Sequence, residues 1–269
     1  MSEPSRDDLL RFRDVAEAIV RETRSVVLAA LAREVPHRLK ADGTFVTDVD
    51  LQVEDLVRSR LGAQFPEHGI LGEERAETAG ASGYLWVVDP IDGTHSLKHR
   101  IPLFGTILAL RRNGRSILGV IDLPMLDRTY VGLEGLGAYR NGERVRSTDV
   151  PEPEAVEREV IATGERRQFV AAGKVDAFDR LMRAHGSVRT YCDCFGHALA
   201  IEGSVGAMVD YNLRLWDVAA TEVLIREAGG VIEHVARRGS SSPGEEMHDV
   251  VFGKPGVVAW VRRALGDGA

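Results

Sequence analysis

The chain of 269 residues contains only two cysteines, Cys192 and Cys194, which flank one aspartate. A disulfide framework needs more cysteines than this, and a structural zinc site usually needs four ligands, so the pair favours neither. Two small buried side chains are a simpler interpretation than metal or redox chemistry. Because nothing here indicates an oxidising compartment, we expect a cytoplasmic protein.

Long hydrophobic runs and a basic excess are also missing. No apolar run approaches the roughly 20 residues of a membrane span, and residues 1–14 contain no apolar signal core, so we expect no membrane partner. Lysine and arginine number 34 against 41 acidic residues, a formal net charge of -7. With no basic stripe among aromatics, the sequence argues against nucleic-acid binding. An anionic substrate stays compatible, because divalent cations would reverse the sign at a carboxylate site.

One stretch, residues 84–94, concentrates side chains suited to chemistry. Its apolar first half predicts a buried strand, and we expect Asp89-Pro90 to end that strand, because proline cannot donate to the ladder. Gly93 allows a tight turn, and Thr94 can begin a short helix whose free N–H groups face an anion. Two carboxylates, Asp89 and Asp92, beside such amides indicate metal ions and a phosphate.

Further acids stand at the ends of other predicted elements. Asp50 and Asp217 each stand at a predicted helix start, where an acid is usually a cap, so capping and catalysis both stay open. Magnesium prefers oxygen ligands and keeps several waters, so few carboxylates plus a substrate phosphate can hold it. Two such ions, about 4 Å apart, would find ligands in a set of acids and one carbonyl: Glu73, Asp89, Asp92, Asp217 and the Ile91 carbonyl.

The periodicity of the chain predicts two α+β or α/β halves. Residues 1–149 read as an N-terminal α+β domain with a long first helix ending before Pro36, an antiparallel sheet and the main metal site. Residues 150–269 alternate strand and helix and read as a C-terminal α/β domain that supplies Asp217 and substrate contacts. An acidic stretch with prolines, residues 149–154, is interpreted as the connection.

Three motifs together resemble the inositol monophosphatase superfamily. They are Gly72-Glu73-Glu74, the block from Trp86 to Thr94, and Trp216-Asp217-Val-Ala-Ala followed by Glu227-Ala-Gly-Gly230. The resemblance covers nearly the whole chain in the same order and with comparable spacing. It implies a five-layer αβαβα sandwich, commonly a homodimer, and a magnesium-dependent phosphomonoesterase that uses metal-activated water. A non-catalytic binding protein on this fold should have lost ligands, whereas every matched acid is present, so we expect an enzyme.

The resemblance also implies roles for individual residues. Glu73, Asp89 and the Ile91 carbonyl would hold one Mg²⁺, and Asp89, Asp92 and Asp217 a second, with a third, looser ion near Glu73 in some members. Thr94, supported by Asp50, would orient or deprotonate the attacking water, so Thr94, Asp50 and Glu73 are the candidate catalytic residues. The amides of Gly93 and Thr94 would bind phosphate.

The substrate is predicted from a segment that departs from the inositol type. Where inositol-type members usually carry a Gly-Ser-Ala-Ala-like run, this chain has Cys192-Asp193-Cys194-Phe195-Gly196-His197, which is similar to histidinol-phosphate phosphatases of the superfamily. The candidate substrate contacts are Asp92, Asp193 and Asp210. We therefore expect histidinol phosphate, a substrate of histidine biosynthesis, ahead of inositol 1-phosphate, with sugar phosphates and nucleotide 3′-phosphates as further alternatives.

Overall fold

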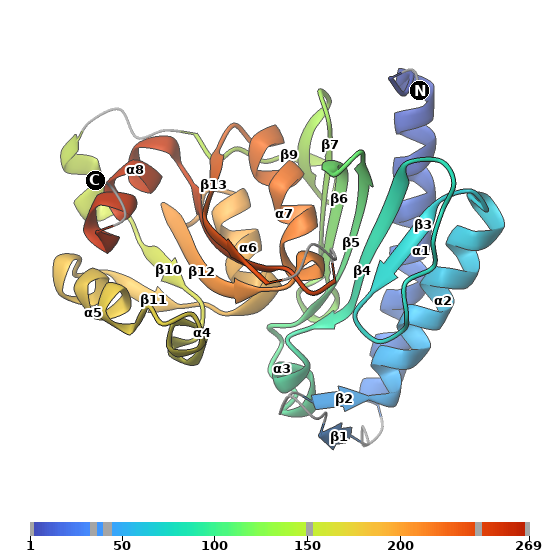
Figure 1. Cartoon of the computed structure of the whole chain (residues 1–269), viewed down its shortest axis with the longest axis horizontal. Coiled ribbons are helices and arrows are strands. Elements are labelled where there is room, and N and C mark those ends of the chain that lie inside the picture. Colours follow the sequence, from blue (N-terminus) through green and yellow to red (C-terminus); the bar gives the residue numbers. More distant parts are fainter. Residues whose placement is uncertain (1–2, 33–36, 40–44, 149–152, 240–243, 267–269) are drawn as a thin grey trace.

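The structure, a computed structural model, describes residues 3–32, 37–39, 45–148, 153–239 and 244–266. In these ranges helices and two large sheets alternate in five layers, as Figure 1 shows. The predicted αβαβα sandwich is confirmed. The predictions for Pro36 and for the connection at residues 149–152 lie outside the described residues.

The first layer is formed by two helices, α1 (Arg6–Leu31) and α2 (Asp48–Gln64). A capping box begins α1: the Ser5 hydroxyl accepts from the Asp8 N–H at 3.1 Å, and the Asp8 carboxylate accepts from the Ser5 N–H at 3.0 Å. Apolar side chains such as Ile19 and Val53 are buried against Trp86 of the sheet. Each such burial contributes roughly 1.5–3 kcal/mol, so packing holds these helices in place.

The second layer is a sheet of strands in the order β3-β4-β5-β6-β7-β8-β9, antiparallel throughout except for the parallel pair β3 and β4. The strands are β3 (Gly69–Gly72), β4 (Tyr84–Asp92), β5 (Gly105–Arg112), β6 (Arg115–Leu123), β7 (Arg128–Leu133), β8 (Gly137–Arg140) and β9 (Glu143–Arg144). The antiparallel sheet of the first half is thus as predicted. Smaller elements around it are β1 (His37–Leu39), β2 (Phe45–Thr47), α3 (Thr94–Lys98) and a 3₁₀ turn, Pro124–Leu126.

The prediction that Asp89-Pro90 ends a strand is wrong. β4 continues to Asp92, but its register against β5 shifts between Asp89, opposite Ile107, and Asp92, opposite Gly105. Proline is tolerated there because the strand bulges, and because β3 pairs with β4 only as far as Val88. The bulge places both Asp89 and Asp92 at the end of one strand.

Three further layers follow: a helical layer, a second sheet and an outer helical layer. The middle layer holds α6 (Asp193–Ile201) and α7 (Leu215–Glu227), whose side chains form one core with both sheets. The second sheet has the order β11-β10-β12-β14-β13. Its strands are β10 (Ile161–Thr163), β11 (Val188–Thr190), β12 (Ala207–Leu213), β13 (Val231–Arg238) and β14 (Met247–Gly253). Outside it lie α4 (Arg166–Ala171), α5 (Val175–Ala184) and α8 (Pro255–Leu265), with a 3₁₀ turn, Pro153–Arg158.

The second half differs from its prediction at several places. Neither the short helix α4 nor β14 was predicted, although β14 lies between β12 and β13 and pairs with both. Asp217 was expected before a helix, whereas α7 begins at Leu215 and contains Asp217 in its first turn. No helix in the described ranges is both long and apolar enough to span a bilayer.

Candidate active site

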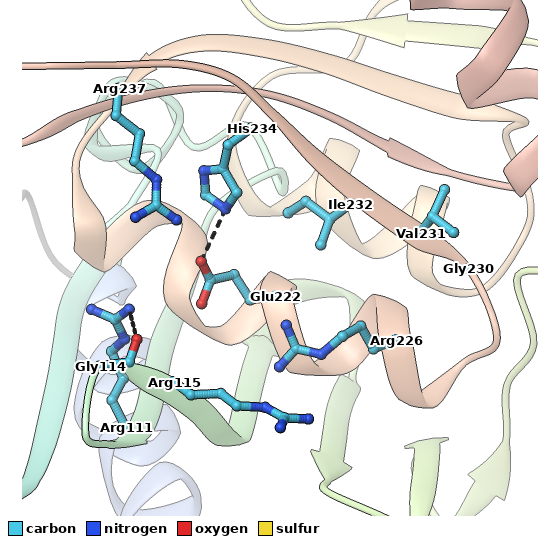
Figure 2. Close-up of a pocket in the computed structure, with 10 residues that line it drawn as sticks. All are labelled: Arg111, Gly114, Arg115, Glu222, Arg226, Gly230, Val231, Ile232, His234 and Arg237. Atoms are coloured by element: carbon cyan, nitrogen blue, oxygen red, sulfur yellow. Dashed lines mark hydrogen bonds and ion pairs between the residues drawn. The ribbon is translucent and has the colours of Figure 1, made fainter.

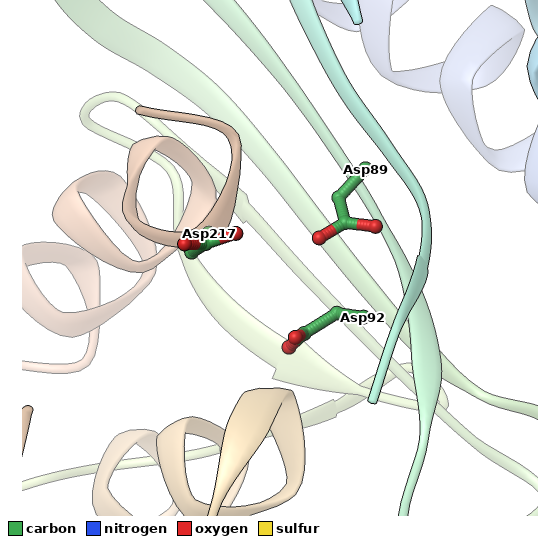
Figure 3. Close-up of side chains that lie close together, drawn as sticks. All are labelled: Asp89, Asp92 and Asp217. Atoms are coloured by element: carbon green, nitrogen blue, oxygen red, sulfur yellow. The ribbon is translucent and has the colours of Figure 1, made fainter. Parts of the chain in front are cut away.

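Three predicted acids converge between the two sheets. Asp89 and Asp92 extend from the bulged end of β4, and Asp217 from the first turn of α7 (Figure 3). Each offers a carboxylate oxygen, and these oxygens all lie within 4.8 Å of one another. Residues separated by more than 120 positions in sequence are therefore brought into one cluster by the packing of α7 on the first sheet.

This cluster carries strong electrostatic repulsion. Burial raises the pKa of Asp89 well above its ordinary value, and Glu73, Asp92 and Asp217 raise it further. Burial and Asp193 likewise raise the pKa of Asp92. The pKa of Asp217 rises to about 8, through burial and then Glu73. Like charges held close in a low dielectric disfavour ionisation of the carboxyl groups. A cation bound among them would therefore relieve the repulsion and favour their ionised form.

Asp50 and Asp217 act as helix caps and also face the site. In α2 one Asp50 oxygen accepts from the Thr47 N–H at 2.8 Å, while the other lies 3.3 Å from the Thr94 hydroxyl. In α7 one Asp217 oxygen accepts from the Arg214 N–H at 2.7 Å, and the carboxylate still belongs to the cluster. A carboxylate has two oxygens, so the capping interpretation and the functional one are compatible.

Gly93 and Thr94 turn the chain away from β4 beside the cluster. Gly93 has a φ of 85°, in the left-handed region that glycine adopts without strain, and α3 begins at Thr94 as predicted. The Thr94 hydroxyl lies 3.0 Å from the Ile91 carbonyl oxygen and is thus held between Ile91 and Asp50. Asp50 itself is fully buried, and the pKa of its carboxyl rises to about 6 because of that burial.

Glu73 lines the same cavity as the three aspartates but is outside their close cluster. Its loop is held by Glu54 of α2, a residue that the sequence analysis missed. The buried Glu54 carboxylate accepts from the N–H groups of Glu74 at 2.7 Å and Arg75 at 3.1 Å. A β-carbon on Gly72 would lie 2.2 Å from a Glu54 oxygen, so a larger residue there would displace the carboxylate that holds this loop. The spacing of Glu54 four residues after Asp50, on one face of α2, was the available signal.

The cavity around these residues has a volume of about 470 Å³ and a strongly acidic lining. Seven of its described lining residues are acids and two are arginines: Glu73, Asp89, Asp92, Glu165, Asp193, Asp210 and Asp217, with Arg167 and Arg214. All three candidate substrate contacts, Asp92, Asp193 and Asp210, thus lie in it. Glu165 carries no sequence signal and was missed.

Asp193 and Asp210 form the second acidic part of the cavity. Asp193, the first residue of α6, has a φ of 59°, and burial followed by Asp210 and Glu165 raises its pKa to about 7. One oxygen of Asp210 lies 3.2 Å from the Nε2 atom of His197, whose Nδ1 atom lies 2.7 Å from the Thr221 hydroxyl. The other Asp210 oxygen is buried and has no hydrogen-bond partner among the described residues.

The donor set fits magnesium. One oxygen of Asp89 is buried without a hydrogen-bond partner in the described part of the chain. This is expected of an oxygen that would coordinate a metal ion. The convergent atoms are carboxylate oxygens, the type that Mg²⁺ prefers, whereas a zinc site would favour histidine or thiolate. Cys194 is buried: its backbone N–H donates to the Asp92 carboxylate, and its thiol donates to the Asp92 carbonyl oxygen at 4.0 Å.

We predict that the metal-free protein loses stability as the pH rises from about 6.5 to about 8. Asp193 and Asp217 have folded pKa values near 7 and 8 against an ordinary 3.8, so the folded chain binds protons that the unfolded chain has released. This stabilisation is complete below pH 3.8 and disappears as the pH passes the folded values. The buried histidines His68 and His248, with pKa values near 4 against an ordinary 6.5, oppose this loss at the lower end of the window, and their effect fades as the pH rises above 6.5.

Thermal melts in EDTA should show a midpoint that falls by roughly 5 °C or more across this window. Added Mg²⁺ should remove most of the slope, because the cation replaces the protons. Asp217→Asn should flatten the slope in EDTA. A midpoint in EDTA that stays constant or rises between pH 6.5 and 8 would contradict the repulsive cluster.

The αβαβα sandwich with carboxylates converging from a strand end and a helix start defines a metal-dependent phosphomonoesterase. More narrowly, the chain belongs to the inositol monophosphatase family, whose sequence model matches residues 8–261. Members of this family use Mg²⁺.

Individual relatives agree with this assignment. The chain is 36% identical to a histidinol-phosphatase of Chlorobaculum parvum over 77% of this chain and 79% of that one. It is 32% identical to a histidinol-phosphatase of Mycobacterium tuberculosis over 84% and 86%. Among solved structures, an inositol monophosphatase from Anabaena (Nostoc) superposes with a TM-score of 0.80 at 26% identity, covering 96% of each chain.

Proposed function

We propose that this phosphomonoesterase hydrolyses histidinol phosphate to histidinol and phosphate. The observation that carries the proposal is the second acidic part of the cavity, where Asp193, Asp210 and Glu165 lie beyond the three clustered aspartates. Histidinol phosphate carries an ammonium and an imidazole, which such acids would bind, whereas an uncharged inositol ring would offer them only hydroxyl groups and no positive charge. Its two relatives named histidinol-phosphatase support the same substrate.

The proposal gives each clustered residue a role. Glu73, Asp89 and the Ile91 carbonyl would hold one Mg²⁺, and Asp89, Asp92 and Asp217 another; a third ion near Glu73 is the looser part of the proposal. These cations would supply charge neutralisation for the phosphate and the leaving oxygen. Thr94, positioned by Asp50, would orient the attacking water by its hydroxyl, and the amides of Gly93 and Thr94 would contact the phosphate.

The proposal also covers the division of the chain into two domains, its oligomeric state and its location in the cell. Residues 1–149 would carry most of the metal ligands, and residues 150–269 would supply Asp217 and the substrate contacts. By its family the chain would form a homodimer, which light scattering can test, and it would act in the cytoplasm.

A side-by-side assay tests the substrate. Phosphate release should be measured with Mg²⁺ on histidinol phosphate, inositol 1-phosphate, fructose 1,6-bisphosphate and 3′-phosphoadenosine 5′-phosphate. We expect the largest kcat/KM on histidinol phosphate. Preference for inositol 1-phosphate would move the chain to the inositol type, and no release from any ester would favour a non-catalytic binding protein.

We predict that Asp193→Asn weakens histidinol phosphate hydrolysis selectively. A charge-assisted hydrogen bond to an ammonium is worth about 1.5–3 kcal/mol, so kcat/KM should fall about tenfold or more. Asparagine tolerates the left-handed backbone of this position, so the fold should persist. Inositol 1-phosphate hydrolysis should change little, because its phosphate contacts remain. Equal losses on both esters would show that Asp193 does not bind the leaving group.

A further inference from the structure

A second pocket, of about 400 Å³, lies between the hairpin that joins β5 to β6, the later turns of α7, and β13 (Figure 2). None of its lining residues lines the acidic cavity. Its charge is of the opposite sign: the lining includes four arginines, Arg111, Arg115, Arg226 and Arg237. This volume is within the range of small-ligand sites.

Backbone features of the hairpin and of β13 place two of these arginines. The hairpin closes through Asn113-Gly114, both at positive φ, and Arg111 donates to the Gly114 carbonyl, which holds its side chain across the turn. In β13 the register shifts between His234 and Ala236. One extra residue in the strand reverses the alternation, so Arg237 joins His234 on the face toward α7. Both residues line the pocket in Figure 2.

The acids that line the pocket do not balance these cations, although Glu246 also acts on Arg111 and Glu227 on Arg226 from outside the lining. Glu222 is the only acid that lines the pocket within the described residues, and it is committed to His234 at 3.1 Å and Ser116 at 2.8 Å. Burial raises the pKa of Glu222, but these partners and Arg111 outweigh that effect and lower it to about 2. Arg115 pairs with Glu134 at 2.6 Å, which leaves Arg111, Arg226 and Arg237 against Glu222.

Two buried polar atoms of the lining residues lack partners. The Nε atom of Arg111 and the Nδ1 atom of His234 make no hydrogen bond to any described residue. Burial lowers the pKa of Arg111, an effect that Glu222 opposes and Arg237 reinforces. A partly buried guanidinium beside another guanidinium gains from an anion, which neutralises the repulsion and accepts hydrogen bonds from N–H groups such as the Nε–H of Arg111.

We propose that this arginine pocket binds a small oxyanion, a phosphate or carboxylate group, at a site separate from catalysis. Arg237 and Arg111 would bind the oxygens from two sides, with Arg226 on α7 contributing charge. A guanidinium group can donate two parallel hydrogen bonds to a carboxylate or to a phosphate. Either kind of ligand would therefore be bound by the same interactions.

Calorimetric titration of the full-length chain tests the site, at low salt and after a chelating resin has removed divalent cations without adding a carboxylate to the buffer. Sodium phosphate is titrated in one arm and malonate in the other. Without divalent cations the seven acids of the catalytic cavity repel anions, so binding there should not contribute. We expect one binding event per chain and a higher melting midpoint with the bound anion.

Arg237→Ala should weaken binding tenfold or more and abolish the rise in midpoint. Arg237 is exposed, so the variant should fold. The matched control is Arg263→Ala, an exposed arginine of α8 that lines neither pocket, which should bind like the parent. Binding of either anion that is lost in Arg237→Ala supports the site, and binding of only one of the two also identifies its source. No binding of either anion, or equal affinity in Arg237→Ala and the parent, overturns it.

Discussion

Asp89→Asn should lower phosphate release by three orders of magnitude or more on every ester that the parent hydrolyses. Asp89 is the most buried of the three clustered aspartates, and the proposal assigns it to both cations. Removing its charge would therefore weaken both metal sites at once, and losses on the order of 10³-fold or greater are typical when charge stabilisation of a transition state is removed.

The same substitution should leave the metal-free protein folded and no less stable. Asparagine keeps the shape of the side chain and removes one charge from a repulsive cluster, so the midpoint in EDTA should stay constant or rise. The rise in midpoint on adding Mg²⁺ should shrink sharply. Asp176→Asn, which removes an exposed charge from α5 outside the cavity, is the matched control. Near-parental activity in folded Asp89→Asn would refute the two-metal assignment.

Thr94→Ala should separate water activation from metal binding. The Thr94 hydroxyl lies 3.0 Å from the Ile91 carbonyl and 3.3 Å from Asp50, but the side chain supplies no carboxylate. We expect kcat to fall by roughly 10²–10⁴-fold, the range for a positioned proton-transfer group. The concentration of Mg²⁺ that gives half-maximal activity should change less than about threefold, since the carboxylates remain.

Thr94→Ser is the informative partner of this variant. Serine keeps the hydroxyl and removes only a methyl group, so it should recover most of the lost kcat. Weak Mg²⁺ binding with a preserved kcat in Thr94→Ala would show instead that Thr94 only begins α3 and shapes the turn.

Local signals in the sequence were sufficient for the elements that build the site. The start of α3 at Thr94, which the sequence predicted, depends on neighbours a few residues apart, as do the Ser5 cap and the Asn113-Gly114 hairpin. Caps and turns can be predicted from a few consecutive residues, because both depend on interactions between neighbours in the chain. The resemblance of three motifs to one superfamily also predicted the family and the layered fold.

The features that were missed depend on partners far apart in the chain. β14 is a strand because it lies between β12 and β13, and β4 continues past Pro90 because β5 pairs around the bulge. Glu165 reaches the cavity only through the packing of the second sheet.

By itself, then, the sequence determined the class of chemistry, since the acids near Gly93 and Thr94 and the acid after Trp216 are of the type that binds magnesium. Tertiary structure decided which carboxylate oxygens lie close enough together to hold a metal ion. It also decided that Asp50 caps its helix with one oxygen and faces Thr94 with the other, and that Asp217 caps its helix while its carboxylate belongs to the cluster. It alone showed the arginine pocket, whose lining residues come from a hairpin, a helix and a bulged strand. The physical reason is that burial and charge repulsion depend on distances through space, which no spacing along the chain specifies.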